Sequence, residues 1–234
     1  MIEIKNLSKS YVENKKAVDN VSLYVEDGDI FAFVGLNGAG KSTTIKSIVG
    51  ILPFEEGEIL VNGKSITKDP IDCKLEMAYV PDNPEIYPFM KGIDYVKFIL
   101  SLYRVEFNES EVIEMAKKLE IYDALADLVS SYSHGMKQKI VLLAAFLHHP
   151  NVLIFDEPFV GLDPKATHML KEIMKDLASQ GKTIFFSTHV LEVAEKLCNK
   201  VAIIKEGKVI ICGKMEDIAG KEGLESAFLG VNNE

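Results

Sequence analysis

Short apolar runs separated by turn signals fill the first third of the chain, a pattern typical of β-strands. Apolar and polar residues alternate along residues 2–5, and a second β-like run at residues 21–25 leads into a turn at Asp27-Gly28. Residues 30–34 are all apolar, as in a strand that is buried on both faces of a sheet. This part of the chain is therefore predicted to be mostly β-structure.

The middle of the chain shows the periodicity of α-helices. Asn108 and Glu111 have the spacing of a capping box, in which each side chain bonds to the backbone of the other residue. The apolar residues that follow recur with helical spacing at Val112, Met115, Ala116 and Leu119. Similar apolar faces predict helices over residues 93–103 and 135–147.

Alternation of strands and helices returns after residue 150. Apolar runs occur at residues 152–155, 183–186 and 201–204, and a helix is expected from Pro164 to Ser179. This order predicts an α/β fold in which a helical insertion interrupts the sheet.

The changes in character along the chain suggest where its parts begin and end. We expect residues 1–83 and 151–213 to form one core, and residues 84–150 to form a helical unit. Residues 214–234 are expected to add a C-terminal helix and tail.

The composition is that of an ordinary soluble globular protein, since 47% of the 234 residues are hydrophobic and 26% are charged. A net charge of −9 disfavours nucleic-acid binding, because nucleic-acid-binding domains are usually basic. The longest apolar run, residues 140–147, is far shorter than the roughly 20 residues of a membrane helix. No secretory signal begins the chain, so we expect a cytoplasmic protein. Three widely spaced cysteines, Cys73, Cys198 and Cys212, fit neither a disulfide framework nor a zinc site and are expected to be reduced.

The most specific motif follows the apolar run at residues 30–34. Residues 35–43 match G-x-x-x-x-G-K-[ST] between a strand and a helix, the loop that binds nucleotide phosphates. In such a loop, backbone N–H groups converge on the phosphates, the lysine reaches the β- and γ-phosphates, and the serine hydroxyl binds Mg²⁺. The sequence therefore predicts a nucleoside triphosphate site made of Gly35, Asn37, Gly38, Ala39, Gly40, Lys41, Ser42 and Thr43.

Two carboxylates, Asp156 and Glu157, end the apolar run at residues 152–155. Ligands of α/β sheets bind at the carboxyl ends of strands. Asp156 is predicted to hold Mg²⁺, as the strand-end aspartate of P-loop NTPases does. Because side chains alternate along a strand, Glu157 is predicted to face the γ-phosphate and to deprotonate a water molecule. The alternative is a solvated acidic turn before Pro158.

Together these residues resemble the ATP-binding cassette (ABC) family, the nucleotide-binding subunits of ABC transporters, over nearly the whole chain. The diagnostic segment is Tyr-Ser-His-Gly-Met-Lys-Gln-Lys at residues 132–139, which is similar to the family signature Leu-Ser-Gly-Gly-Gln. Ser133 is expected to cap the helix that follows. The resemblance implies that Ser133, His134 and Gly135 contact ATP held by a second cassette, in a head-to-tail dimer around two ATP molecules.

The resemblance also implies a particular fold. It is an α/β fold with a P-loop NTPase core of the RecA-like type, built on a mixed sheet with flanking helices. An N-terminal antiparallel β-subdomain and an inserted α-helical signature subdomain complete it.

Three further segments match the family. Gly161-Leu162-Asp163 is similar to the D-loop, which meets its counterpart across the dimer interface. His189 resembles the switch histidine that contacts the γ-phosphate and helps to hold the attacking water, although a lone histidine at a strand end is more often structural. Tyr11 stands where the family has an aromatic residue that stacks on adenine, a contact worth about 1–3 kcal/mol with nucleic-acid bases. Simple packing at a strand edge is the alternative for Tyr11.

Two parts of the sequence depart from the family pattern. Asp82 stands where the family has a glutamine, and an ionised aspartate accepts hydrogen bonds but does not donate them. It either approaches Mg²⁺ through water or belongs to a turn with Asn83-Pro84. His134 and Met136 replace a glycine and a glutamine of the signature, and because histidine rarely adopts positive φ, a differently shaped loop is expected. These variants resemble cassettes of exporters for peptides, antibiotics and lipid-like cargo.

A loop after Asp82 is unusually apolar, with Ile86, Tyr87, Phe89 and Met90 close together. The resemblance implies that this region docks on an integral membrane permease subunit, and exposed apolar patches often mark such surfaces. The alternative is that these side chains close the core of their own domain.

We therefore predict an ATP-hydrolysing subunit of an ABC transporter, held at the inner face of the cell membrane by a permease and paired with itself or a paralogous cassette. The first alternative is a non-transport cassette that acts as an ATP-dependent scaffold or regulator. The second is an ATP-binding module that barely hydrolyses ATP.

Overall fold

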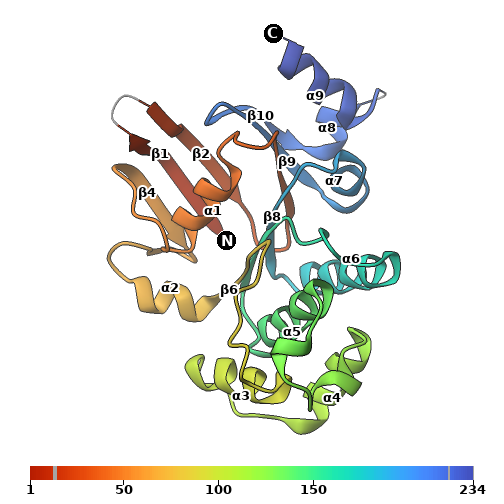
Figure 1. The fold of residues 1–234 in the computed structure, drawn as a ribbon. Coiled ribbons are helices and arrows are strands. Elements are labelled where there is room, and N and C mark those ends of the chain that lie inside the picture. The colour runs from red at the N-terminus through yellow and green to blue at the C-terminus, as the bar shows by residue number, and fades with distance from the viewer. Residues whose placement is uncertain (13–14, 221, 234) are drawn as a thin grey trace.

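The computed structural model describes residues 1–12, 15–220 and 222–233, and these residues form two β-sheets with helices around them (Figure 1). The smaller sheet is antiparallel, with the strand order β2-β1-β4-β5. Its strands are β1 (Ile2–Val12), β2 (Lys15–Val25), β4 (Glu56–Val61) and β5 (Lys64–Ser65). This sheet corresponds to the expected N-terminal antiparallel unit.

The larger sheet has the order β10-β9-β3-β8-β7-β6 and is mixed, because β10 runs antiparallel to β9 while the other pairs are parallel. Flanked by helices, it is the mixed sheet of an α/β fold, as predicted. Its strands are β3 (Ile30–Val34), β6 (Met77–Val80), β7 (Val152–Asp156), β8 (Thr183–Thr188), β9 (Lys200–Lys205) and β10 (Lys208–Lys214).

Three helices group at one end of the molecule, opposite the C-terminal helix α9 (Figure 1). They are α3 (Gly92–Leu102), α4 (Glu109–Lys118) and α5 (His134–Leu147). Short 3₁₀ turns at Tyr122–Ala124 and Val129–Ser131 connect α4 to α5. The other helices are α1 (Lys41–Ile48), α2 (Pro70–Glu76), α6 (Pro164–Ser179), α7 (Leu191–Leu197), α8 (Met215–Ala219) and α9 (Gly223–Asn233).

Strand β3 lies between two apolar clusters, and each of its residues is buried. Phe31 and Phe33 lie on one face of the strand, where their rings contact Phe185 at centroid distances of 5.6 and 5.5 Å. Ala32 and Val34 belong to the cluster on the other face, which includes the residues of α5. The prediction of a strand buried on both faces is confirmed, and packing on both faces holds in place the strand that leads into the predicted phosphate loop.

The predicted helices and the strands of the larger sheet are confirmed to within a few residues, but β1 and β2 are six or seven residues longer than predicted. The capping box at Asn108 is only half correct. The Asn108 side chain accepts a hydrogen bond from the Glu111 N–H at 3.3 Å. The Glu111 carboxylate does not return to the backbone of Asn108, because it lies 3.2 Å from His149 Nε2 instead. The boundaries that we expect between the core, the helical unit and the C-terminal segment, at residues 83, 150 and 213, stay predictions.

Two further findings concern the expectations from composition. Within the described residues, none of the helices combines the length and apolar character that crossing a membrane requires. The three cysteines are unpaired; Cys73 and Cys198 are buried, whereas Cys212 is exposed.

A buried histidine ends the longest helix of the helical group. His148 follows α5, and its ring stacks on Tyr103 with centroids 3.7 Å apart and an angle of 11° between the planes. Its Nδ1 is buried and has no hydrogen-bond partner among the described residues. Burial lowers the pKa of His148 from 6.5 to about 4, because the charged ring loses its hydration.

We expect the free energy of unfolding to fall as the pH decreases from 6.5 toward 4. In this range the unfolded chain takes up a proton on His148 and the folded chain does not. At one pKa unit per 1.36 kcal/mol, the full effect is about 3 kcal/mol. Replacing His148 by phenylalanine, which keeps a ring against Tyr103, should remove this part of the pH dependence in urea unfolding. The control His168→Phe, at an exposed position on α6, should not. An unchanged profile in His148→Phe would contradict the prediction.

Candidate functional site

The loop between β3 and α1 is held against its neighbours at both ends, where only glycine fits. A Cβ on Gly35 would lie 2.6 Å from the carbonyl oxygen of Ile204. Gly40, which precedes α1, has φ 109°, and a Cβ there would lie 2.6 Å from the carbonyl oxygen of Ala17. Gly35 and Gly40 are therefore required by the local packing as well as by the motif, whereas a Cβ on Gly38 would meet nothing within 4 Å and only its φ of 81° favours glycine.

Lys41 lies beneath this loop and is only 6% exposed. Its ammonium group donates to the carbonyl oxygens of Gly35 at 2.8 Å and Leu36 at 3.3 Å. Glu157 Oε1 lies 3.4 Å from Lys41 Nζ. The charge of the lysine is thus balanced by the carboxylate that the sequence predicts as the base.

Glu157 also contacts His189. Its Oε2 lies 2.9 Å from His189 Nδ1 and accepts from the His189 backbone N–H at 3.3 Å. The predicted reason for its orientation is wrong, because β7 ends at Asp156 and Glu157 has a left-handed φ of 51° instead of continuing the strand. The structure nevertheless brings the three predicted catalytic residues, Lys41, Glu157 and His189, into one connected group.

Asp156 is 1% exposed and has a partner that the sequence motifs do not single out. The Ser187 hydroxyl donates to Asp156 Oδ1 at 2.6 Å and accepts from the Glu157 N–H at 3.0 Å. Ser187 lies opposite Asp156 in the register of the parallel strands β7 and β8. The feature of the sequence that could have indicated this role is a serine directly after the apolar run at residues 183–186, two residues before His189.

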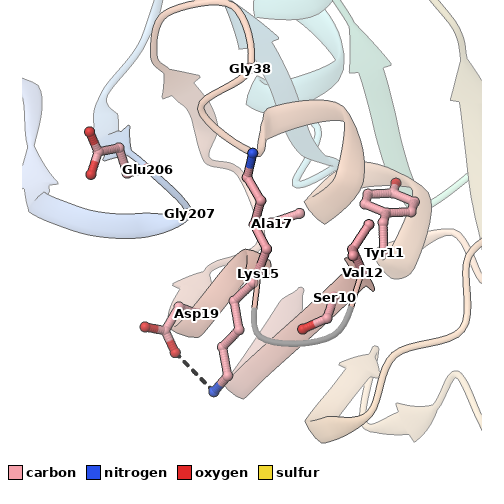
Figure 2. A pocket seen from close by; sticks show the side chains of 10 residues that line it. Ser10, Tyr11, Val12, Lys15, Ala17, Asp19, Gly38, Glu206 and Gly207 are labelled. Carbon is pink, nitrogen blue, oxygen red and sulfur yellow. Dashed lines mark ion pairs between the residues drawn. The ribbon is translucent and has the colours of Figure 1, made fainter.

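Tyr11 lies at the rim of an open pocket of about 970 Å³ beside the loop (Figure 2). The ring is 62% exposed, and its hydroxyl lies 3.3 Å from Thr43 Oγ1. Figure 2 shows the phosphate loop at Gly38 and the turn at Glu206-Gly207 on other sides of this pocket. Because the ring is exposed, its face is available to a ligand. A tyrosine that only packed at the strand edge would be expected to be more buried.

The signature segment begins α5. The Ser133 hydroxyl accepts from the Met136 N–H at 3.2 Å, so the predicted cap is confirmed. His134 is the first residue of the helix and does not have positive φ, so the reason for expecting a distorted loop is wrong. Within the described residues, no hydrogen bond or ion pair joins Ser133, His134 or Gly135 to the phosphate loop of the same chain.

Asp163 and Asp82 both make local contacts. Asp163 caps α6 by accepting from the Ala166 N–H at 2.8 Å, and its other oxygen lies 3.5 Å from Lys139 Nζ. The Ala166 N–H, with help from Lys139, holds the pKa of Asp163 below its usual value. Asp82 is exposed and accepts from the N–H of Asn83 at 2.8 Å, which fits the turn alternative; its role toward a metal stays a prediction.

The oxygen donors at this edge of the sheet suit a hard cation with phosphate ligands. Among the described residues, no group of three or more histidine, cysteine or acidic side chains is arranged to hold a metal by itself. Mg²⁺ does not need one, because it usually binds through one or two carboxylates together with phosphates and water. Asp156, at the buried strand end, and the exposed serine Ser42 fit this requirement.

Comparisons with known proteins agree with this geometry. A family model described as ABC transporter matches residues 18–160. EcsA, an ABC-type transporter ATP-binding protein of Bacillus subtilis, is 33% identical over 231 residues, which are 98% of this chain and 93% of EcsA. A solved ATP-binding subunit of an ABC transporter has a TM-score of 0.91 at 32% identity and covers 99% of both chains. The dimeric post-hydrolysis structure of the cassette MJ0796, bound to ADP and Pi, has a TM-score of 0.83 at 23% identity and covers 92% of this chain and 99% of that chain.

The mixed sheet and the glycine loop over a buried lysine define a P-loop NTPase. Within that class, the chain belongs to the ABC transporter family and is one of its ATP-binding ATPase cassettes.

Ser187→Ala should lower the free energy of unfolding by about 1–3 kcal/mol, because it leaves a buried carboxylate and the Glu157 N–H without a partner. Urea unfolding would measure the loss. Ser179→Ala, which removes a hydroxyl from the exposed end of α6, is the control and should change stability by less than about 0.5 kcal/mol. Equal effects of the two substitutions would show that Ser187 does not support the two carboxylates.

Proposed function

We propose that the chain hydrolyses ATP with Glu157 as the general base. The observation that carries the proposal is the position of Glu157 between Lys41 and His189, at the carboxyl ends of adjacent parallel strands. A base must be within reach of the water whose proton it accepts, and this edge of the sheet is where α/β enzymes bind their ligands.

The contacts of Lys41 suggest the order of events. In the structure, the Lys41 ammonium group pairs with the Glu157 carboxylate and donates to two loop carbonyls. The phosphates of ATP compete for the ammonium group, and when Lys41 turns to them the Glu157 carboxylate is free to accept a proton. Water then attacks the γ-phosphorus, the new P–O bond forms as the bond to the bridging β–γ oxygen breaks, and ADP and phosphate leave.

His189 and the metal ligands complete the proposed site. The contact between Nδ1 and Glu157 orients the His189 ring. Ser42 and Asp156 would hold Mg²⁺, which neutralises charge on the phosphates when bound. Asp82 is proposed as a further ligand through water.

We also propose that two cassettes pair head to tail. Within the described residues Ser133, His134 and Gly135 do not bond to the loop of their own chain, yet Ser133 caps a helix whose N-terminal N–H groups suit an anion. The γ-phosphate of ATP on a second copy, or on a paralogous cassette, is the anion that we assign to them. The dimeric MJ0796 cassette supports this arrangement.

The proposed partner is an integral membrane permease that docks near Tyr87 and Phe89. Phe89 is 88% exposed and Tyr87 is also exposed, whereas Ile86 packs against the core. The core-closing alternative therefore holds for Ile86. Tyr87 packs edge-on against Phe98 with part of its ring exposed, and Phe89 is left for a partner. This docking would place the chain at the inner face of the membrane. The signature variant and Asp82 favour an exporter; a scaffold or regulator is the alternative.

Glu157→Gln should lower steady-state ATP hydrolysis by about 10²–10⁴-fold, because glutamine does not accept the proton. It should also accumulate a dimer with Mg²⁺ and ATP, which size-exclusion chromatography with light scattering would detect. Glu195→Gln, at an exposed position on α7, is the matched control and should hydrolyse ATP normally. Unimpaired hydrolysis by Glu157→Gln would exclude its role as the base.

Phe89→Ser should weaken docking while leaving the ATPase activity of the isolated chain unchanged. An adjacent reading frame with about six membrane-spanning segments would identify the permease. With that permease in vesicles, we expect stimulation of ATP hydrolysis in the wild type and a loss of stimulation in Phe89→Ser. Leu229→Ser, at an exposed apolar position on α9, should keep it. Equal stimulation of both variants would exclude this surface, and the absence of any such frame would favour the scaffold.

A further inference from the structure

The turn between β9 and β10, residues 206–207, contacts the phosphate loop. The Gly207 N–H donates to the carbonyl oxygen of Ala39 at 2.9 Å. Gly207 has φ 79°, and a Cβ there would lie 2.8 Å from the carbonyl oxygen and 3.1 Å from the carbonyl carbon of Ala17. The motifs of the sequence do not single out this glycine.

The same turn is joined to strand β2. The Gly207 carbonyl oxygen accepts from the Asp19 N–H at 2.9 Å, and Lys208 forms an ion pair with the Asp19 side chain at 3.3 Å. The carbonyl oxygen of Ala17 lies between Gly40 of the phosphate loop and Gly207 of the turn, and neither position has room for a Cβ. Three backbone segments therefore meet at Ala17 without an intervening side chain.

This junction determines where Tyr11 lies relative to the loop. Strand β2 pairs with β1 through Ser10↔Lys16 and Val12↔Lys15, on either side of Tyr11. Tyr11, Ala17, Gly38 and Gly207 line one pocket (Figure 2). A displacement of Ala17 would move β2 together with the hairpin that carries Tyr11.

We propose that Gly207 is a positioning residue that sets the spacing between the phosphate loop and Tyr11, and so matches the site to a ligand with both an aromatic base and a triphosphate. This inference rests on the proposed function. Gly207 acts through Ala39, to which its N–H donates, and through Ala17, against which it packs. A side chain at this position would push β2 and the loop apart.

The test compares Gly207→Ala with Gly181→Ala. Gly181 has φ 83°, close to that of Gly207, but a Cβ there would meet nothing within 4 Å, so the control carries the backbone strain without the collision. Isothermal titration calorimetry would measure the binding of ATP and of inorganic tripolyphosphate, which contacts the loop alone. We expect Gly207→Ala to weaken ATP binding at least ten-fold and tripolyphosphate binding less than three-fold. Gly181→Ala should change neither by more than two-fold.

Equal losses for ATP and tripolyphosphate would overturn the inference, because they would mean that Gly207 supports the loop and not the spacing. No loss for either ligand would also overturn it. If Gly207→Ala does not fold, Gly207→Asn replaces it, with Gly181→Asn as its control, because asparagine tolerates positive φ better. A comparison of ATP binding by the wild type and by Tyr11→Ala separates the two proposals. If the wild type fails to bind ATP, the proposed function fails. If the wild type binds ATP and Tyr11→Ala binds it more weakly, the proposed site stands and the Gly207 variants test the further inference alone.

Discussion

The parallel alignment of β3, β8 and β7 is the constraint on which the site depends. Their register places Val34 beside Thr188 and Asp156 beside Ser187, so the three strands end at the same edge of the sheet. The residues that follow these strand ends include the phosphate loop, Glu157 and His189. A buried ammonium group such as that of Lys41 is costly without a partner. The alignment supplies the partner, because it brings Glu157 to within 3.4 Å of Lys41.

The parts of the fold that were predicted from sequence are those that local patterns determine. The all-apolar run of β3, the periodicity of α4 and the spacing of the phosphate loop each lie within a short stretch of chain. The orientation of Glu157 was predicted for the wrong reason, because a left-handed residue ends the strand alternation without any sign in the sequence. The partners of Asp156 and Ala39 were not predicted, because they are far away in sequence. Ser187 meets Asp156 through the register of β7 and β8, and Gly207 meets Ala39 where the turn after β9 contacts the loop after β3.

The change from glycine to histidine in the signature shows how the fold accommodates a departure from its family. His134 takes helical φ, so the glycine is not needed there. The imidazole ring of His134 instead needs space on the segment that it contacts. Gly161 leaves that space, because a Cβ on Gly161 would lie 2.4 Å from His134 Cδ2. The ring of His134 therefore packs directly on Gly161, where the left-handed φ of 78° also favours glycine.

This contact links two parts of the chain that serve different nucleotides in the proposed dimer. His134 belongs to the helix tip that we assign to ATP on the second cassette. Gly161 lies four residues after Glu157, which we propose as the base for ATP of its own chain. Asp163, in the same loop, pairs with Lys139 of the signature helix at 3.5 Å. Close-packed segments shift together. If the nucleotide of one cassette displaced the helix tip, the shift would therefore pass through this loop toward Glu157, the proposed base for the other nucleotide.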